Sequence, residues 1–413
     1  MVLVNHTSRA KEPRFLAFDL FCGAGGTTRG FIDARGYVVA GVDNDPMCRK
    51  TYVMNNKNEF PPFEPPAYLQ YDLLPGLDGS VEGQRRAMER IEVLLNSVRL
   101  RYPSLPLVAA VTPPCQPFTR LGRLGRTDER ALQHELDSTL LIQSVNFIRK
   151  FLPDVIFSEN VPGIDNPAYG GIWSEFITRL QELGYVVGDA RVCASRFGVP
   201  QYRRRAIIVA IRRSVILPEL KTAARLDLPE EDPEADLITV EKAIGHLPPL
   251  EAGEAHPTIA NHRTRKLSKI NLQRLASVLP GEQNTVLAET AYGDLSLRCH
   301  VRLRERTNGR AGFTDVYTRM DPHKPSPTIT TKCHSVSNGR FGHFDMHQVR
   351  GISLREAAIL QSFPENYVFY PESAITPVAK MIGNAVPPKL ARFFITWALE
   401  RVDLAYIREM RAV

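Results

Sequence analysis

A thiol and a carboxylic acid stand out in this sequence as a pair that can do chemistry. Cys115 lies in the string PPCQ, and Glu159 begins the string ENV. Carbon 5 of a cytosine ring is a poor nucleophile, but it becomes reactive when a thiolate adds to carbon 6 and an acid protonates ring nitrogen 3. Cysteine and glutamate suit these two roles, so the pair indicates covalent activation of a pyrimidine ring.

The residues around Cys115 favour a reactive thiol over a packing role, although an isolated cysteine is usually a small buried hydrophobic residue. The apolar run 105–114 places Cys115 at the carboxyl edge of an expected sheet, where open α/β folds bind ligands. The next segment, residues 117–130, contains two glycines and four arginines. This composition is typical of a loop that closes over a site and contacts phosphates.

A glycine-rich string, residues 21–26 (FCGAGG), lies between an expected strand and an expected helix and can bring the backbone close to a ligand. Thr28 stands in place of the third glycine of the dinucleotide fingerprint, so an ordinary tight turn is an alternative. Asp43 follows about twenty residues later, where a carboxylate can accept hydrogen bonds from ribose hydroxyls. Asp72 could hold an adenine amino group. Either acid on its own would more often be a capping residue at the protein surface. The glycine-rich string followed in order by Asp43 and Asp72, however, predicts a nucleoside cofactor.

These residues need a scaffold, and the chain from Arg14 to Arg213 reads as alternating strands and helices. We expect strands at residues 15–21, 37–45, 105–114, 154–161, 185–192 and 206–213. We expect helices at 26–36, 132–150, 173–183, 353–363 and 387–402. The pattern predicts an α/β fold with a doubly wound, mostly parallel sheet, on which the last helix packs back.

The alternation stops after Arg213, where the sequence becomes rich in Pro, Glu and Asp and then in Arg, His and Asn. We therefore expect a second, smaller domain with a hinge at residues 214–350. The first domain would comprise residues 15–213, completed by residues 351–413, and residues 1–14 would form a flexible arm.

Charge and composition narrow the class of protein. The 413-residue chain has a net charge of +7 and an isoelectric point near 9.1, which fits a polyanionic partner. No run approaches the roughly 18 apolar residues of a membrane span, and residues 1–15 lack the apolar core of a secretion signal, so we expect a cytoplasmic protein. The six cysteines are scattered and predict free thiols. Neither Cys299-His300 nor Cys333-His334 matches a common zinc spacing, so no metal is predicted.

Taken together, the motifs resemble those of the bacterial cytosine-C5 DNA methyltransferases, which use S-adenosylmethionine. The resemblance extends over residues 18–213 and 325–398. In chain order, the resembling strings are DLFCGAGG, GVDND, YDL, TPPCQPF, FSENV, GVPQYRRR, PSPTITT, LQSFP and IGNAVPP. Their number, order and spacing make the resemblance far more specific than any single motif.

The resemblance implies roles for individual residues. Cys115 would be the nucleophile, and Glu159 would hold and protonate the cytosine ring. Arg203 and Arg205 would fix the bound base and nearby oxygens, and Asn160 would support the local backbone. Without the resemblance, these arginines would be interpreted as part of a solvated basic turn. The S-adenosylmethionine pocket would be lined by Phe21, Gly23, Gly25, Asp43, Asp72, Leu140, Asn384 and Val386.

Three positions depart from the family's commonest residues. Asp43 stands where a longer Glu is usual, Thr112 replaces a Gly or Phe, and Thr119 replaces a frequent Ser. Asp43 keeps the carboxylate but shortens its reach, which bears only on the ribose contact.

The resemblance further implies duplex DNA as the partner, with the target cytosine flipped out of the stack. Residues 214–324 would hold the target-recognition region, with basic clusters at 262–269 and 298–310. A solvated face explains any single basic residue there as well as DNA contact does. We expect a nucleoid-associated protein that acts as a monomer, with a cognate restriction endonuclease or defence system as a candidate partner.

Two other functions remain open from the sequence, although we favour DNA methylation. The string PCQPFTRLG also resembles the branch of the family that methylates cytosine in transfer RNA. Against this, the Cys-Phe-Thr tripeptide of that branch is absent and the recognition region is long. An inactive DNA-binding regulator is the other interpretation, and the intact Cys115, Glu159, Arg203 and Asn384 argue against it.

Overall fold

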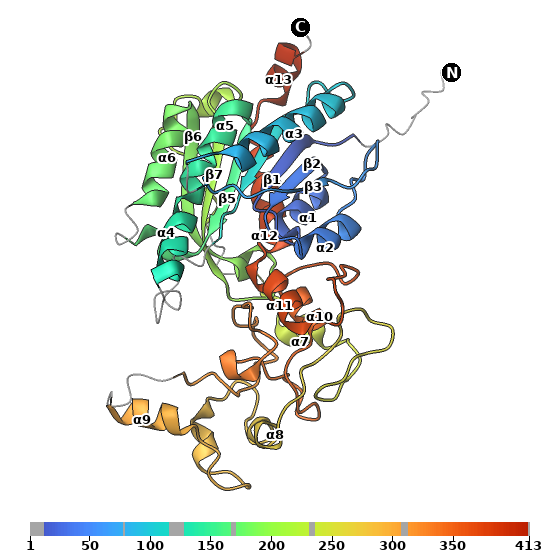
Figure 1. Ribbon diagram of the computed structural model, residues 1–413, viewed down its shortest axis with the longest axis vertical. Helices are drawn as coiled ribbons and strands as arrows, with labels where there is room; N and C mark the ends of the chain where they lie inside the picture. The colour runs from blue at the N-terminus through green and yellow to red at the C-terminus, as the bar shows by residue number, and fades with distance from the viewer. Residues whose placement is uncertain are drawn as a thin grey trace.

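The computed structural model describes residues 12–76, 79–114, 128–166, 171–230, 236–306 and 313–411. Within these residues the chain forms a seven-stranded sheet with the strand order β3-β2-β1-β4-β5-β7-β6 (Figure 1). The strands are β1 Phe15–Leu20, β2 Gly36–Asp43, β3 Ala67–Gln70, β4 Leu107–Val111, β5 Val155–Asn160, β6 Tyr185–Cys193 and β7 Arg204–Arg212. Neighbours from β3 to β5 are parallel, whereas β7 is antiparallel to both β5 and β6. The predicted doubly wound, mostly parallel sheet is confirmed.

The strand order changes direction between β1 and β4, the two central neighbours of the sheet. Open α/β folds bind ligands at such a point, outside the carboxyl ends of the strands. Phe21 follows β1 there, and Thr112 follows β4. The N–H of Thr112 donates to the carbonyl of Leu20 at 3.4 Å, which keeps the two strand ends together. The topology therefore points to this edge as the place for a site.

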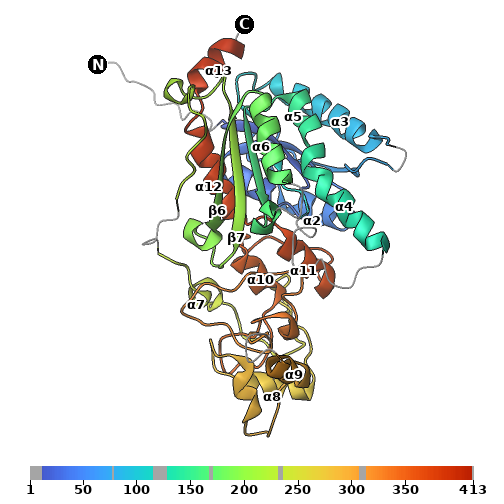
Figure 2. The same ribbon diagram turned by 90° about the vertical axis from the view of Figure 1, so that its left-hand side faces the viewer.

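Helices cover both faces of the sheet (Figure 2). One face carries α1 (Gly26–Asp33) and α12 (Pro388–Leu399), and the other carries α3 (Glu82–Arg99), α4 (Asp128–Gln143), α5 (Val145–Phe151) and α6 (Ile172–Glu182). Along β1, Leu16 and Phe18 pack in the core under α3 to α6, while Phe15 and Ala17 pack in the core under α1 and α12. Both faces of the strands are buried, which explains why they read as continuous apolar runs.

The contact between α1 and α12 depends on a glycine. A Cβ at Gly30 would lie 2.4 Å from the carbonyl oxygen of Pro388 and 2.9 Å from the Cβ of Ala391. Any side chain there would force the two helices apart. The last expected helix therefore packs back on the sheet, as predicted from the sequence.

The helices differ from the sequence expectations in two ways. The helix expected at residues 132–150 is divided into α4 and α5 at Ser144. The hydroxyl of Ser144 donates to the carbonyl of Leu141 at 2.6 Å, a local bond that favours a break in the helix. α3 is absent from the expected elements, as are the shorter helices α2 (Cys48–Asn55), α11 (Ile375–Asn384) and α13 (Leu404–Arg411).

Residues 214–350, the predicted recognition region, contain little regular structure in their described part. Their helices are α7 Val240–Ile244, α8 Lys269–Ala276 and α9 Arg298–Arg306, with short 3-10 turns at Pro218–Leu220, Asn284–Ala288 and Val336–Asn338. Most of this region lies beyond the carboxyl edge of the sheet, with α10 (Leu354–Leu360) and α11 between the two (Figure 1). Its first part instead packs in the core of the sheet through Val215, Ile216, Leu226 and Leu228. The domain division at residues 213 and 350 remains a prediction.

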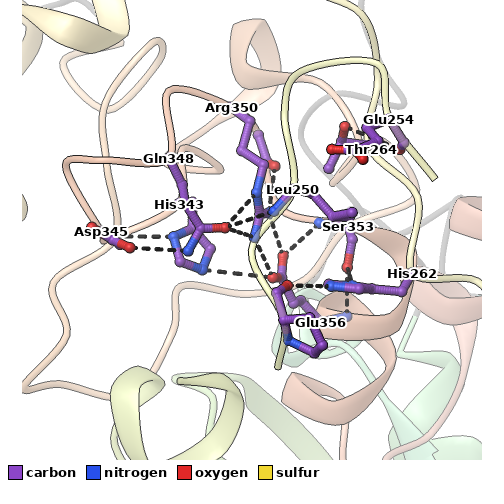
Figure 3. A network of polar contacts seen from close by, with 12 residues as sticks. Leu250, Glu254, His262, Thr264, His343, Asp345, Gln348, Arg350, Ser353 and Glu356 are labelled. Carbon is purple, nitrogen blue, oxygen red and sulfur yellow. Dashed lines mark hydrogen bonds and ion pairs between the residues drawn. The ribbon is translucent and has the colours of Figure 1, made fainter. Parts of the chain in front are cut away.

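A buried polar network fixes this region to the start of α10 (Figure 3). The guanidinium of Arg350 donates to both carboxylate oxygens of Glu356, at 2.7 and 2.8 Å. Glu356 also accepts from the N–H of Ser353 at 2.6 Å, and the Ser353 hydroxyl accepts from the N–H of Glu356 at 3.1 Å. This reciprocal capping box begins the helix and pairs two of its terminal donors. His262 Nδ1 lies 2.9 Å from the Ser353 hydroxyl and extends the network into the recognition region.

Several general features of the described residues bear on function. None of their helices is long and apolar enough to cross a membrane. No group of three or more His, Cys, Asp or Glu side chains in the described part of the chain is placed to hold a metal ion. Cys22, Cys48 and Cys333 are buried, Cys193 and Cys299 lie nearer the surface, and these five cysteines form no disulfide.

Candidate active site

The loop after β1 folds tightly through left-handed backbone conformations. Phe21, Gly23 and Gly25 have φ angles of 64°, 49° and 94°. Glycine adopts such angles without strain. Gly25 is required for a second reason, because a Cβ there would lie 2.4 Å from Nδ2 of Asn56 and 2.8 Å from the hydroxyl of Tyr367. The loop is therefore pressed closely against side chains behind it.

Asp43, the last residue of β2, holds this loop from the other side. Its Oδ2 accepts from the N–H of Gly23 at 2.8 Å, and its Oδ1 accepts from the N–H of Asp45 at 2.9 Å. Burial raises the pKa of Asp43, and the two N–H donors act against that rise. Each carboxylate oxygen keeps a further lone pair. Asp43 can thus position the loop and still accept from a ligand hydroxyl, a contact that stays a prediction.

Asp72 and Leu140 come from two other elements. Asp72 follows β3, and its Oδ1 accepts from the N–H of Leu74 at 3.0 Å. Its Oδ2 accepts from Nδ2 of Asn44 at 3.5 Å. Leu140 belongs to α4 and is 5% exposed. Asp72 can accept a hydrogen bond from a purine amino group, and Leu140 can pack against the purine ring.

A cavity of about 590 Å³ lies at the carboxyl edge of the sheet, and its size is typical of small-molecule sites. The predicted residues that line it are Phe21, Gly23, Asp43, Asp72, Leu140, Glu159, Arg203, Arg205, Asn384 and Val386. Gly25 is not part of the lining and faces Asn56 and Tyr367 instead. The fold therefore brings residues from both ends of the sequence to one cavity.

Glu159 and Arg205 form a buried ion pair at this cavity. Glu159 of β5 is in register with Ile207 of the antiparallel strand β7, so Arg205 is its diagonal neighbour on the same face. Nε of Arg205 lies 2.6 Å from Oε1 of Glu159, and the two residues are only 7% and 8% exposed. The reversed direction of β7 thus places a cation beside the predicted proton donor.

Arg203 is also buried at the cavity, where it bonds main-chain oxygens. Its guanidinium donates to the carbonyls of Ile329 at 3.0 Å, Gly383 at 3.1 Å and Ala385 at 3.3 Å. The last two flank Asn384, one of the predicted cofactor residues. Arg203 therefore ties the end of α11 to the start of β7, while its predicted contact with the base stays a prediction.

The chain reaches the cavity at Pro113 and Pro114, immediately before Cys115. Nδ2 of Asn160 donates to the carbonyl of Pro113 at 3.3 Å, and its Oδ1 accepts from the N–H of Val161 at 2.8 Å. These bonds fix the backbone that leads to Cys115, in agreement with the support expected from Asn160. Cys115 itself and residues 117–127 of the predicted closing loop lie outside the described residues.

Comparison with known proteins decides the family. The sequence profile described as C-5 cytosine-specific DNA methylase matches residues 15–64 and 107–398. The chain belongs to this family. It is 34% identical over 376 residues to the Type II methylase M.HgiDII of Herpetosiphon aurantiacus, covering 91% of this chain and 92% of that one. It is 29% identical to the Type II methyltransferase M1.HphI of Haemophilus parahaemolyticus, covering 91% and 84%.

Solved structures agree with this fold. A putative DNA modification methyltransferase encoded in an Escherichia coli prophage superposes with a TM-score of 0.60 at 20% identity, over 94% of this chain and 99% of that one. The Dnmt2 methyltransferase of S. pombe superposes with a TM-score of 0.52 at 14% identity, over 94% and 98%. At these identities the likeness shows the fold alone. The predictions of family, fold class and enzyme class are confirmed, and this chain is a DNA cytosine-5 methylase.

One wall of this methylase's cavity comes from α11, which is absent from the sequence expectations. It contributes Lys380 and Met381 to the lining. Nζ of Lys380 lies 3.4 Å from Oδ2 of Asp45, which links α11 to the segment after β2. Buried Val378 and Ile382, one helical turn apart, are the signal that would have predicted this helix.

Proposed function

We propose that the protein transfers a methyl group from S-adenosylmethionine to carbon 5 of a cytosine that is flipped out of duplex DNA, through a covalent bond between Cys115 and carbon 6. One observation supports this most: a single cavity is lined both by the loop of Gly23 with Asp43 and by the ion pair of Glu159 and Arg205. A methyl donor and a pyrimidine ring would therefore meet in one place.

The lining of the cavity suits S-adenosylmethionine. Asp43 and Asp72 offer carboxylate oxygens to ribose hydroxyls and an adenine amino group, and Phe21, Leu140 and Val386 offer apolar surface to the purine. When bound, this cofactor supplies an electrophilic methyl group carried on a sulfonium. The part of the protein is to hold that group beside the ring and keep water out.

The side chains would activate the cytosine in two linked steps. The Cys115 thiolate forms a bond to carbon 6 while Glu159 gives a proton to nitrogen 3, and the displaced electron pair makes carbon 5 nucleophilic. After methylation, transfer of the proton on carbon 5 to solvent restores the ring double bond and expels Cys115 as the thiolate, and nitrogen 3 returns its proton to Glu159. Arg205, whose Nε lies 2.6 Å from Oε1, holds the Glu159 carboxyl group at the cavity.

The setting of the reaction follows from the relatives and from the substrate. The Herpetosiphon and Haemophilus relatives carry Type II names, which supports a restriction-modification role with a cognate endonuclease as partner. Residues 214–350 would recognise the target sequence, and the DNA of the nucleoid would be the place of action. A flipped base costs a few kcal/mol, which contacts from this region would offset.

The proposal is tested by incubating the protein with S-adenosylmethionine labelled on the methyl group and with either unmethylated plasmid DNA or bulk transfer RNA. We expect label in DNA alone, and bisulfite sequencing should locate 5-methylcytosine in one sequence context. The Cys115→Ser variant should lose all methylation yet still bind S-adenosylhomocysteine. Label in transfer RNA alone would contradict the proposal, as would DNA binding without any methylation by the wild type.

A further inference from the structure

The hydroxyl of Tyr367 lies directly behind the glycine-rich loop of the cavity. It donates to the carbonyl oxygen of Ala24 at 2.5 Å and accepts from Nδ2 of Asn56 at 2.9 Å. Tyr367 is 2% exposed, and burial raises the pKa of its phenol, so the hydroxyl remains a donor at any physiological pH. Ala24 lines the cavity, whereas Tyr367 does not.

The carbonyl of Ala24 finds its hydrogen-bond donor outside its own loop. Ala24 stands between Gly23 and Gly25, both at positive φ, and glycine has little conformational preference of its own. The N–H of Gly23 is held by Asp43 on one side of the loop. The hydroxyl of Tyr367 supplies the matching contact on the other side. Together with the turn bond from the N–H of Gly25 to the carbonyl of Cys22 at 2.8 Å, these two bonds select one loop conformation.

Tyr367 is in turn held by residues of the recognition region. Arg355 of α10 donates from a terminal nitrogen to the carbonyl of Tyr367 at 2.9 Å and from Nε to the carbonyl of Ala260 at 3.0 Å. The side chain of Asn261 bonds both main-chain groups of Phe369, accepting from its N–H at 2.8 Å and donating to its carbonyl at 2.9 Å. The segment that carries Tyr367 is therefore clamped to residues 260 and 261.

We propose that Tyr367 is a positioning residue for the methyl-donor site: it holds the Ala24 carbonyl so that the loop fits S-adenosylmethionine, and the recognition region sets its position. The role rests on the proposed function, since it concerns the cofactor of that reaction. Tyr367 acts through Ala24 and contacts neither the cavity nor the reacting atoms. A buried carbonyl without its donor is costly, so the loop would shift when the hydroxyl is removed.

The test removes one oxygen atom and compares it with a matched control. Tyr367→Phe keeps the ring and deletes the hydroxyl. The control, Tyr185→Phe, deletes a hydroxyl from a tyrosine that is equally buried, with 1% exposure. This hydroxyl donates to the carbonyl of Pro153 at 2.6 Å. Tyr185 is the first residue of β6 and is not part of the cavity lining. Affinity for S-adenosylhomocysteine, measured by isothermal titration calorimetry on the full chain, needs no knowledge of the DNA sequence.

We expect Tyr367→Phe to raise the Kd for S-adenosylhomocysteine about fivefold to thirtyfold, within the cost of leaving one buried carbonyl without its donor. Tyr185→Phe should leave this Kd within about twofold while lowering the melting temperature similarly. An unchanged Kd in Tyr367→Phe, or an equal rise in both variants, would overturn the inference. Failure of the wild type to bind the ligand would instead overturn the proposed function and the inference together.

A second variant tests the link to the recognition region. Asn261 has a φ of 61°, so Asn261→Gly keeps the backbone unstrained while removing both bonds to Phe369. We expect a rise in the Kd for S-adenosylhomocysteine in the same direction as for Tyr367→Phe, although Asn261 is not part of the lining. An unchanged Kd would contradict the claim that this region sets the position of Tyr367.

Discussion

The ion pair between Glu159 and Arg205 explains how a carboxylate can lie beside the cavity with almost no exposure to water. Removing a carboxylate from water costs several kcal/mol, and a close, well-oriented guanidinium offsets much of that cost. Nε of Arg205 lies 2.6 Å from Oε1, but the contact lacks hydrogen-bond geometry, and no described group donates a hydrogen bond to that oxygen. Such a pair adds little net stability, but its charge attraction holds the carboxyl group at the cavity. A proton donor to a ring nitrogen has to be held within reach in this way.

Glu159→Gln preserves the size of the side chain and removes its acidic proton. We expect kcat for DNA methylation to fall by about 100-fold or more, because general acid catalysis contributes 10²–10⁴-fold. The Kd for S-adenosylhomocysteine should stay unchanged, because the glycine-rich loop and Asp43 are untouched. Arg205 loses its buried partner, so the free energy of unfolding should fall by roughly 3 kcal/mol. Single-turnover methylation and calorimetry measure these effects, and a kcat within tenfold of the wild type would contradict the role.

The elements differ in how far the sequence alone could predict them. Strands β1, β4 and β5 were predictable because both of their faces are buried and they read as short apolar runs. α3 was equally predictable, since Ala87, Ile91 and Leu95 are buried at helical spacing. The break at Ser144 depends on one local hydrogen bond, for which the apolar pattern gives no signal.

The residues of the site could also be predicted only in part from the sequence. The resemblance assigned ten of the thirty residues that line the cavity, and the other lining residues had no predicted role. The bonds from Arg203 to the carbonyls of Gly383 and Ala385, and from Tyr367 to Ala24, could not be predicted. These bonds join segments that are far apart in the chain, and their acceptors are main-chain carbonyls. Every residue has such a carbonyl, so the sequence does not indicate which ones accept a side-chain hydrogen bond.

The network at the start of α10 makes stability depend on pH (Figure 3). His343 accepts from the N–H of Asp345 at 3.2 Å, and its Nε2 lies 3.6 Å from Oε1 of Glu356. Burial, with help from Arg350 and Arg319 and against the pull of Glu356 and Asp345, lowers the pKa of His343 from 6.5 to about 4. Between about pH 4 and pH 6.5, His343 therefore binds a proton in the unfolded chain but stays neutral in the folded protein. Stability is full above about pH 6.5 and is lost as the pH falls toward about 4, by at most about 3 kcal/mol.

His343→Asn should reduce this dependence. We expect the slope of the unfolding free energy against pH, measured by urea denaturation between pH 4 and 6.5, to fall by up to about 1.4 kcal/mol per pH unit, the value for one proton. His262 and His334, whose pKa values burial also lowers, keep part of the slope. His323→Asn is the control, because its side chain is 81% exposed. Equal slopes in the wild type and in His343→Asn would contradict this account.

In the molecule as a whole, most of the predicted recognition region (residues 214–350) lies beyond the cavity, and α9 lies far from the sheet (Figure 1). Arg298, Arg302 and Arg306 are exposed on this helix, and the chain carries a net charge of +7. Arginine side chains that neutralise DNA phosphates release bound cations, so binding weakens as salt rises. The distribution of charge therefore predicts that this end of the molecule contributes to DNA affinity.

Replacing Arg298 and Arg302 together by Ala tests that prediction. We expect weaker binding to plasmid DNA and a decrease of about 2 in the slope of log Kd against log salt concentration, close to one for each phosphate that is no longer neutralised. The control replaces Arg85 and Arg86 on α3, which are 53% and 60% exposed and lie on a helix that covers the sheet. A similar decrease of slope in both double variants would rule out a specific role for α9.

The covalent step is the central claim, and trapping the adduct tests it most directly. Plasmid DNA synthesised with 5-fluorocytosine in place of cytosine presents every sequence context of that plasmid, and fluorine blocks the proton loss that would expel Cys115. With S-adenosylmethionine present, the wild type should form a stable protein–DNA complex. Mass spectrometry of its peptides should place the bond on Cys115, and Cys115→Ser should form none. Methylation of ordinary DNA with no adduct on the fluorinated DNA, or an adduct on a different cysteine, would contradict the account.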